Sequence, residues 1–278
     1  MNILKLILVF LSLPFLVSVL HAQPSPASDH VDIRLITQQN FGVSGGEMMI
    51  GLHFEIEDGW HVYWQNPGDS GMPVRVSWTA NDYFSFGSIQ WPYPMTFQEE
   101  HLITYGYKDE TLLMLPVTIT ENAPKGTYTA EAFIQYLACE RICLPGFETH
   151  TIQIEIRDEK PVAKSGYESL FERFASKLPV ESNGLNAYFE RNNDVVSLEL
   201  TGDLPEGFEP ETLRFFASAE NQLESSSPQK FEFDGNSLKV DLRVSRYLNE
   251  EITTLPGVLV VPSNGNTKAV TVLAKPKR

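Results

Sequence analysis

The chain has 278 residues, a formal charge of −15 at neutral pH and 42% hydrophobic residues. An acidic surface of this kind disfavours nucleic acid and anionic membranes as binding partners, because both repel negative charge. Without an N-terminal leader, about 250 residues remain, a length typical of two domains of ordinary size.

Residues 1–22 have the pattern of a secretory signal peptide. Lys5 supplies a positive charge, the segment 6–20 is almost wholly apolar, and Ala22 or Ala27 offers a small residue for cleavage. The apolar run of about 15 residues is shorter than the roughly 20 that span a bilayer, so a membrane anchor is the weaker alternative. No later segment is long and apolar enough to span a membrane. We therefore expect a soluble, exported protein that does not insert into the membrane.

Residues 29–158 show the two-residue alternation of half-buried strands. The longest alternating run is Met48, Ile50, Leu52, Phe54 and Ile56. Further strands are expected at residues 61–64, 74–78, 112–119, 128–137 and 149–156. Many short strands separated by glycine and proline turns, with no helical period, predict an antiparallel β-sandwich for this first module.

Aromatic residues are concentrated in the first module, where all four tryptophans fall between Trp60 and Trp91. Most of these side chains are expected to fill the sandwich core. The segment 91–95 differs, because two prolines in four residues cannot lie in a central strand. It is therefore expected at an edge or in a loop, where its aromatic rings would lie near the surface.

The chain has two cysteines, Cys139 and Cys143, at the end of a predicted strand. A straight strand would hold their Cα atoms about 13 Å apart, whereas a disulfide needs them within about 7 Å. We therefore expect a tight turn at residues 140–142 with the cysteines facing each other across it. The alternation of residues 127–137 places Cys139 on the more polar face of the strand, so its side chain is expected to face solvent.

Three interpretations of the cysteine pair remain open from the residues alone. In an exported protein a disulfide can be a structural staple, although a loop this short contributes only about 2 kcal/mol. It can instead be a redox dithiol, with Glu140 raising and Arg141 lowering the pKa of a neighbouring thiol. Two thiolates can also hold copper(I) or half of a zinc site, with extra ligands from His53, His61, His101 or His150.

Residues 163–278 form a second predicted module. Apolar residues at three- and four-residue steps between 167 and 178 predict a short amphipathic helix at its start. Alternation then returns, and residues 234–236 are typical of a hairpin turn. The fold expected for the whole chain is all-β, with two immunoglobulin-like β-sandwich domains. The second module contains no Cys, His, Trp or Met, which favours a role as a spacer or as a docking surface for a partner.

Five sequence blocks, in order, resemble the periplasmic N-terminal region of the DsbD family of thiol:disulfide interchange proteins, especially its ScsB-like branch. They are residues 61–73, 89–94, 104–107, 115–118 and 136–145. The resemblance implies an immunoglobulin-like sandwich whose redox pair corresponds by position to Cys139 and Cys143. It also implies an aromatic cap over the disulfide, for which the residues available here are Phe97, Tyr105 and Tyr107.

Family members of this kind take electrons from a membrane-embedded donor and pass them to thioredoxin-like periplasmic oxidoreductases. The resemblance therefore implies a periplasmic protein-disulfide reductase with these two partners and no cofactor. The cysteine spacing is shorter than in the best-known members, and the chain ends at Arg278 without the membrane and thioredoxin-like domains, so the donor is expected to be another polypeptide. Two alternatives stay open: a non-catalytic binding or assembly module with a structural disulfide, and a metal-binding protein linked with copper tolerance.

Overall fold

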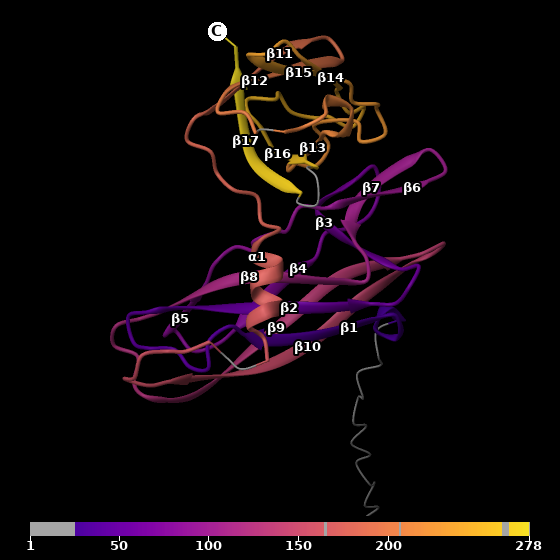
Figure 1. Ribbon diagram of the computed structural model, residues 1–278. Helices are drawn as coiled ribbons and strands as arrows, with labels where there is room; N and C mark the ends of the chain where they lie inside the picture. The colour runs from indigo at the N-terminus through magenta and orange to yellow at the C-terminus, as the bar shows by residue number, and fades with distance from the viewer. Residues whose placement is uncertain (1–25, 164–165, 206, 263–266, 278) are drawn as a thin grey trace, which may run out of the picture.

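The computed structural model describes residues 26–163, 166–205, 207–262 and 267–277. The predicted signal peptide, residues 1–22, lies outside the described residues. Figure 1 shows two bodies built from strands, stacked one above the other, with the single α-helix of the described residues lying over the lower one. The structure is mostly β, and the all-β prediction is confirmed.

The first body is a sandwich of two antiparallel sheets. After a short 3-10 helix at Pro26–Asp29, one sheet has the order β1 (Val31–Thr37), β2 (Glu47–Ile56), β8 (Glu110–Ile119) and β5 (Phe84–Phe86). The other has the order β10 (Cys143–Ile156), β9 (Gly126–Cys139), β3 (His61–Gly68), β7 (Leu102–Tyr107) and β6 (Met95–Glu99), and β4 (Arg75–Thr79) also pairs with β9. Residues 91–94 form a loop, and β6 is an edge strand, as the prolines predicted.

The core of the first sandwich lies between these sheets. Leu52 and Phe54 on β2 face Ile134 and Tyr136 on β9, and all four are fully buried. Burying one such side chain stabilises the fold by about 1.5–3 kcal/mol. The alternation read from the sequence therefore reports correctly which side of β2, and of the middle of β9, packs inward. The same core holds Trp60 and Trp64, as predicted for the aromatic residues.

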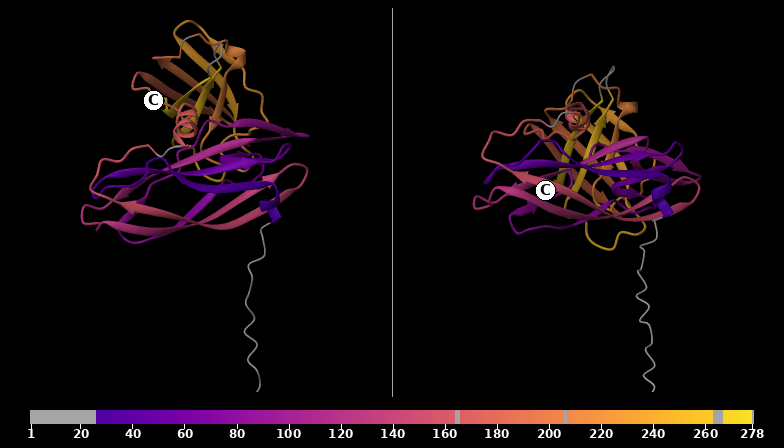
Figure 2. Two further views of the ribbon diagram at one scale, coloured as in Figure 1. Left: turned by 60° about the horizontal axis from the view of Figure 1, so that its bottom comes forward. Right: turned by 90° about the horizontal axis from the view of Figure 1, so that it is seen from below.

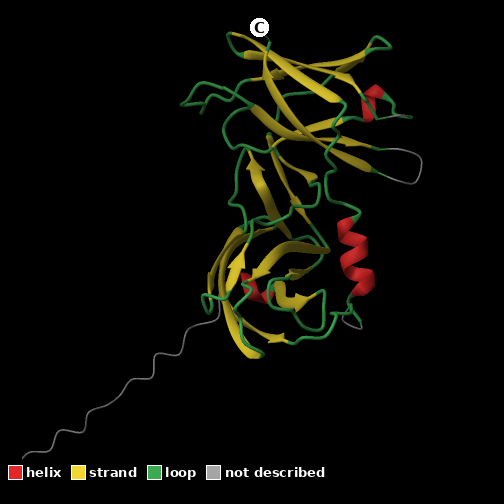
Figure 3. Ribbon diagram, turned by 90° about the vertical axis from the view of Figure 1, so that its left-hand side faces the viewer, coloured by secondary structure: helices red, strands yellow, loops and turns green. Residues whose placement is uncertain are grey.

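The helix α1 (Glu168–Ala175) packs on the first sandwich. Phe171 and Phe174 lie against a buried patch made by Ile36, Leu112 and Met114. In Figure 3 the helix runs along the side of this body. The sequence analysis assigned the helix to the second module. The apolar stripe of the helix shows which of its faces is buried, but it does not show which body that face packs against. No helix among the described residues is long and apolar enough to cross a membrane.

The second body has seven strands in one continuous path. Their order is β13 (Arg214–Ala217), β16 (Leu255–Val261), β17 (Lys268–Pro276), β11 (Leu185–Asn192), β12 (Val195–Gly202), β15 (Ser237–Arg243) and β14 (Phe231–Phe233). A short 3-10 helix, Pro210–Thr212, precedes β13. β11 and β17 pair in parallel through two residues each, and every other pairing in this path is antiparallel. The predicted hairpin turn at residues 234–236 joins β14 to β15.

The two bodies lie against each other (Figure 2), and buried side chains of both form one cluster where they meet. Phe216 on β13 packs edge-on against Tyr105 on β7, with ring centroids 4.9 Å apart, and against Trp64 on β3 at 6.2 Å. Asn66 Nδ2 donates a hydrogen bond to the carbonyl oxygen of Ala217 over 2.8 Å. Because β3 and β7 also lie beside the cysteine pair, the second body contacts the strands that position the site.

Candidate functional site

The cysteine pair closes the hairpin between β9 and β10. Cys139 is the last residue of β9 and Cys143 the first of β10, and they form a disulfide with Cα atoms 4.2 Å apart. Residues 140–142 make the turn, in which the Glu140 amide donates to the Ile142 carbonyl oxygen over 3.1 Å. The predicted chain reversal is confirmed. Cys139 and Cys143 are opposite each other in a ladder that continues through the whole hairpin, so the site rests on a long pair of strands.

The two sulfur-bearing residues differ in exposure. Cys139 is fully buried, whereas Cys143 is exposed. The expectation that Cys139 faces solvent is therefore wrong. Its side of β9 is open to solvent at Glu131 and Phe133 but becomes covered toward the end of the strand. Alternation describes one strand and does not reveal this local cover.

The cover comes from β3 and from the hairpin of β6 and β7. Opposite residues of antiparallel strands point to the same face. His61 pairs with Cys139, so the two side chains lie on the same face of the sheet. Tyr63 is two positions after His61 on β3 and therefore lies on that face too, opposite Gly106 of β7. Phe97 of β6 stacks on His61, with centroids 4.3 Å apart and an interplanar angle of 13°.

Tyr63 is in direct contact with the disulfide. Its hydroxyl donates a hydrogen bond to Cys139 Sγ over 2.9 Å and lies 3.8 Å from Cys143 Sγ. Burial, together with the negative charge of Glu99, raises the pKa of Tyr63 to about 12. The hydroxyl therefore keeps its proton at neutral pH and acts as a donor. Gly71 permits this position, because a Cβ atom there would lie 2.2 Å from the Tyr63 ring.

His61 lies beside Tyr63 under the ring of Phe97. The His61 and Tyr63 ring centroids are 5.1 Å apart, and His61 is 3% exposed. Its Nε2 atom is buried and makes no hydrogen bond with any residue that the structure describes. Burial lowers the pKa of His61 to about 4, because the protonated ring loses its hydration. The site therefore contains a neutral imidazole with an unpaired nitrogen.

The residues suggested as a cap or as flanking groups lie in different places. Phe97 is the one that reaches the site, through His61. Tyr105 faces Phe216 of the second body, and the Tyr107 hydroxyl donates to the Pro92 carbonyl oxygen over 2.6 Å. These two tyrosines have the opposite parity on β7 from Gly106, the partner of Tyr63, so they point away from the disulfide. Glu140 and Arg141 lie exposed in the turn itself.

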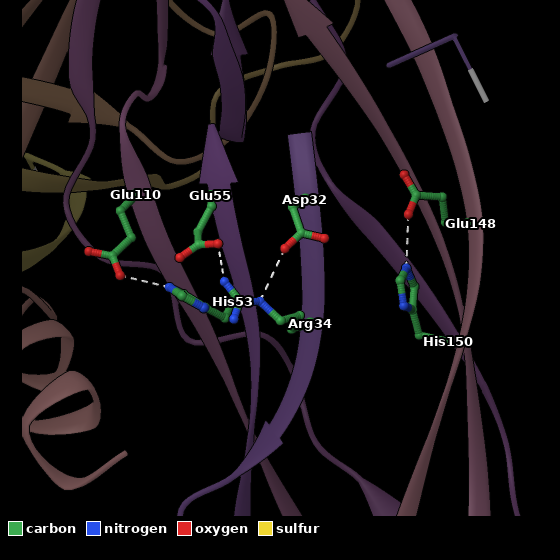
Figure 4. A network of polar contacts seen from close by, with 7 residues as sticks. All are labelled: Asp32, Arg34, His53, Glu55, Glu110, Glu148 and His150. Atoms are coloured by element: carbon green, nitrogen blue, oxygen red, sulfur yellow. Dashed lines mark hydrogen bonds and ion pairs between the residues drawn. The ribbon is translucent and has the colours of Figure 1, made fainter. Parts of the chain in front are cut away.

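The histidines suggested as metal ligands do not converge on the cysteines. His150 lies on the opposite face of β10 from Cys143, and its Nε2 is 2.9 Å from Glu148 Oε2 (Figure 4). His53 pairs with Glu110 at 2.7 Å in the same view. His101 is exposed in the turn between β6 and β7, and His61 alone lies next to the disulfide. Within the described ranges, no three His, Cys, Asp or Glu side chains are grouped so as to hold a metal ion.

The sequence did not identify Tyr63 as part of the site and considered His61 only as a metal ligand. Both are in the block of residues 61–73 that carries the family resemblance, and they are two positions apart on one strand. That spacing puts them on the same face of a strand. The missing information was that this strand lies next to the cysteine hairpin, which requires the pairing of β3 with β9.

The arrangement suits thiol–disulfide exchange. The exposed sulfur of Cys143 is accessible to an incoming thiolate, and the buried sulfur of Cys139 is the leaving group. A hydrogen bond from Tyr63 is in place to stabilise the negative charge that develops on Cys139. A structural staple requires neither this difference in exposure nor a donor directed at one sulfur.

Fold and site together define a β-sandwich domain with an accessible disulfide at a strand hairpin. Residues 34–155 match the family described as "Thiol:disulfide interchange protein DsbD, N-terminal", and the predicted resemblance is confirmed. Residues 34–155 are therefore similar to the N-terminal domain of DsbD, a family whose description is thiol:disulfide interchange.

One solved structure extends the likeness in fold beyond the matched residues. The N-terminal periplasmic domain of ScsB from Proteus mirabilis aligns with a TM-score of 0.63 and 18% sequence identity, over 91% of this chain and 96% of that one. A protein of unknown function from Porphyromonas gingivalis W83 aligns with a TM-score of 0.26 and 8% identity, over 87% and 99% of the two chains. No curated protein matches the chain.

Proposed function

We propose that this protein is a periplasmic thiol:disulfide interchange protein. It takes reducing equivalents from a membrane-embedded electron donor and passes them through Cys139 and Cys143 to thioredoxin-like extracytoplasmic oxidoreductases. The observation that carries the proposal is the asymmetric disulfide: Cys143 is exposed, and Cys139 is buried under the Tyr63 hydroxyl. The DsbD N-terminal match over residues 34–155 supports the same reaction.

Reduction of the disulfide follows from this asymmetry. A thiolate of the donor attacks Cys143 Sγ, and a new S–S bond forms between donor and Cys143 while the Cys139–Cys143 bond breaks. The electron pair of the broken bond remains on Cys139, where the Tyr63 hydroxyl stabilises the thiolate. The second thiol of the donor then attacks the mixed disulfide. The donor leaves oxidised, and both cysteines of this protein are reduced.

Delivery of electrons to an acceptor is the reverse sequence. The Cys143 thiolate attacks the acceptor disulfide, because Cys139 cannot be reached from solvent. A mixed disulfide forms, and one acceptor sulfur leaves as a thiolate. Cys139 then attacks Cys143 Sγ, restores the internal disulfide and releases the second acceptor sulfur. The pair is thus oxidised by two electrons and the acceptor is reduced by two.

The test is the reduction potential of the Cys139–Cys143 pair, measured by equilibration in glutathione and dithiothreitol buffers. An exchange protein is expected to have a potential above about −300 mV, whereas structural disulfides lie below that value. Trapping provides the second measurement. The Cys139→Ser variant should accumulate a mixed disulfide with a thioredoxin-like protein through Cys143, and the matched Cys143→Ser variant should accumulate far less. A potential well below this limit, with no trapped complex, would identify a structural staple instead.

A further inference from the structure

The buried Cys139 must lose a proton in one step of the reaction, although it carries no proton in the disulfide form. In the oxidised protein Cys139 carries no proton. In the reduced protein its thiol must lose a proton before it can attack the mixed disulfide, because the thiolate is the nucleophile. Cys139 is fully buried, so bulk water is not beside it to take the proton. Burial in apolar surroundings also disfavours the free thiolate. An acceptor close to Cys139 is therefore required.

Two side chains cover this sulfur on its own face of the sheet, and only one of them suits the role. Tyr63 is a donor, because its hydroxyl proton is directed at Cys139 Sγ and its raised pKa keeps the phenol neutral. His61 is the residue opposite Cys139 in the pairing of β3 with β9. Side chains in such opposite positions have Cβ atoms about 4.5–5.5 Å apart.

The imidazole of His61 has a nitrogen without a partner. Its Nε2 atom is buried and makes no hydrogen bond with the residues described by the structure. A buried polar atom left unpaired costs about 1–3 kcal/mol, so such atoms are rare without a reason. The neighbouring ring of Phe97 is apolar and offers no partner. The reduced state supplies one, because the Cys139 thiol is then a hydrogen-bond donor next to the imidazole.

We propose that His61 is the proton acceptor that activates Cys139 for the step in which the mixed disulfide is resolved. The inference rests on the exchange function proposed above. The proton of the Cys139 thiol moves to the imidazole, and the Cys139 thiolate attacks Cys143 Sγ. The bond between Cys143 and the acceptor sulfur breaks, and its electron pair leaves with that sulfur as a thiolate. The imidazolium then returns its proton to the departing thiolate or to water.

The elements that flank His61 carry several charged and titratable groups. They are Tyr63 on β3, Glu99 on β6, Glu100 and His101 in the turn after β6, Tyr105 and Tyr107 on β7 (both directed away from the disulfide), Cys139 on β9, Cys143 on β10, and Glu140 and Arg141 between the cysteines. Burial, and not one of these groups, is the cause that lowers the pKa of His61. The imidazole is therefore neutral across the neutral and mildly acidic range while the disulfide is intact. In the reduced protein, an adjacent Cys139 thiolate favours the protonated ring, because the two charges are opposite.

The test separates the two steps of oxidation with a small probe. The fully reduced protein is mixed with an aromatic disulfide whose thiolate is coloured when released. The first colour change reports attack by Cys143, and the second reports attack by Cys139 on the mixed disulfide. Both rates are measured between about pH 5.5 and 8.5 for the natural protein, for His61→Phe, which keeps a flat ring under Phe97, and for His61→Gln, which keeps a polar side chain but cannot act as a base.

The expected result is a selective loss in the second step. In both variants it slows by about a hundredfold or more near pH 6, which is the usual contribution of a general base. The variant rate then rises by about tenfold per pH unit, because it depends on spontaneously formed thiolate, whereas the natural rate stays nearly flat over this range. The first step changes by less than about threefold, because Cys143 is exposed. Near-ultraviolet circular dichroism confirms that each variant is folded.

Three outcomes would overturn the inference. They are an unchanged second step in both variants, an equal slowing of both steps, and a natural second step that already rises by about tenfold per pH unit from pH 5.5. The last needs no variant, so the test holds even if neither substitution folds. A very low reduction potential would instead refute the exchange function itself, and it is measured without these variants.

Discussion

The Tyr63 hydroxyl donates a hydrogen bond to Cys139 Sγ over 2.9 Å, although 76 positions separate the two residues in the chain. The contact exists because β3 lies between β9 and β7, so that the end of β9 meets the start of β3. This hydrogen bond makes the two sulfur atoms of the disulfide chemically unequal. The sulfur that accepts the hydrogen bond is the better leaving group, and the other sulfur is the one that solvent and partners reach.

Replacing Tyr63 by phenylalanine should slow reduction of the disulfide. A hydrogen bond to a charged group contributes about 1.5–3 kcal/mol, so the rate of reduction by a small thiol is expected to fall by about tenfold to a hundredfold. Stopped-flow reduction with dithiothreitol measures the effect. Tyr128→Phe is the matched control, because the Tyr128 hydroxyl donates to the Pro124 carbonyl oxygen and not to a cysteine. Equal rates in the Tyr63 and Tyr128 variants would exclude a role for the hydrogen bond.

The sequence predicted the strands of the first sandwich well and the cover of the site poorly, and the reason is physical. Alternation at residues 48–56 reports burial along one strand, and β2 occupies these positions. The cover over Cys139 depends on which strands are neighbours, namely β3 beside β9 and β6 beside β7. Spacing within one strand carries no information on such pairings. This is why Cys139 was expected in solvent and why Tyr105 and Tyr107 were considered together with Phe97.

The chain reversal between the cysteines could be predicted because it follows from bond geometry alone. The docking of α1 could not, since its apolar face fits either body equally well by composition. The structure shows that Phe171 and Phe174 have a specific patch on the first sandwich. The relative placement of residues two or four positions apart was thus predictable from the sequence. Contacts between residues far apart in the chain were not.

Gly71→Ala should disturb the site through Tyr63. Gly71 has φ of +118°, and an added Cβ would lie 2.2 Å from the Tyr63 ring. The backbone strain alone costs about 1–3 kcal/mol, and displacement of the ring should also slow disulfide reduction about as much as loss of the hydroxyl does. The control is Gly235→Ala, where φ is +94° and no atom lies within 4 Å of the added Cβ.

Denaturant unfolding and the reduction rate are measured on both glycine variants. Both should lose stability, and only Gly71→Ala should lose reduction rate. If Gly71→Ala is reduced as fast as the natural protein, the position of the Tyr63 ring does not govern the reaction.

Phe216→Ala should weaken the joint between the two bodies. Phe216 is 3% exposed and packs against Trp64 and Tyr105 at the interface. Removal of a buried phenylalanine ring typically costs about 3–5 kcal/mol. Because the ring lies between the bodies, the natural protein is expected to unfold in one transition and the variant in two, as followed by tryptophan fluorescence and circular dichroism. All four tryptophans belong to the first body, so fluorescence follows that body and its contact with Phe216 at Trp64, whereas circular dichroism follows both bodies.

Phe233→Ala is the matched control for the interface, because Phe233 lies in the second body and is 45% exposed. It should shift stability much less and leave a single transition. Two transitions already present in the natural protein would show that the bodies unfold independently. In that case the contact of Phe216 with Tyr105 does not couple the second body to the strands around the disulfide.

Glu110→Gln should weaken the attachment of α1 to the first sandwich in a pH-dependent way. Glu110 contacts Arg173 of the helix at 2.6 Å and His53 of β2 at 2.7 Å. Partial burial alone would raise the pKa of Glu110, but the hydrogen bonds from Arg173 and His53 prevail and lower it below the ordinary value of 4.5. A carboxyl group with a depressed pKa in the folded state contributes stability above its unfolded pKa, and this contribution is lost as the pH falls through the folded value.

The free energy of unfolding of the Glu110→Gln variant should therefore be lower than that of the natural protein at pH 7, by less than about 1 kcal/mol because Arg173 is half exposed. The difference should persist down to about pH 4.5 and vanish at lower pH, where Glu110 is protonated and no longer pairs with Arg173 as an ion. Glu172→Gln, at an exposed position of the same helix, is the control and should show a smaller difference at pH 7. Urea titrations at a series of pH values measure both variants. A difference that stays constant from pH 7 to pH 3 would mean that the charge of Glu110 does not hold the helix.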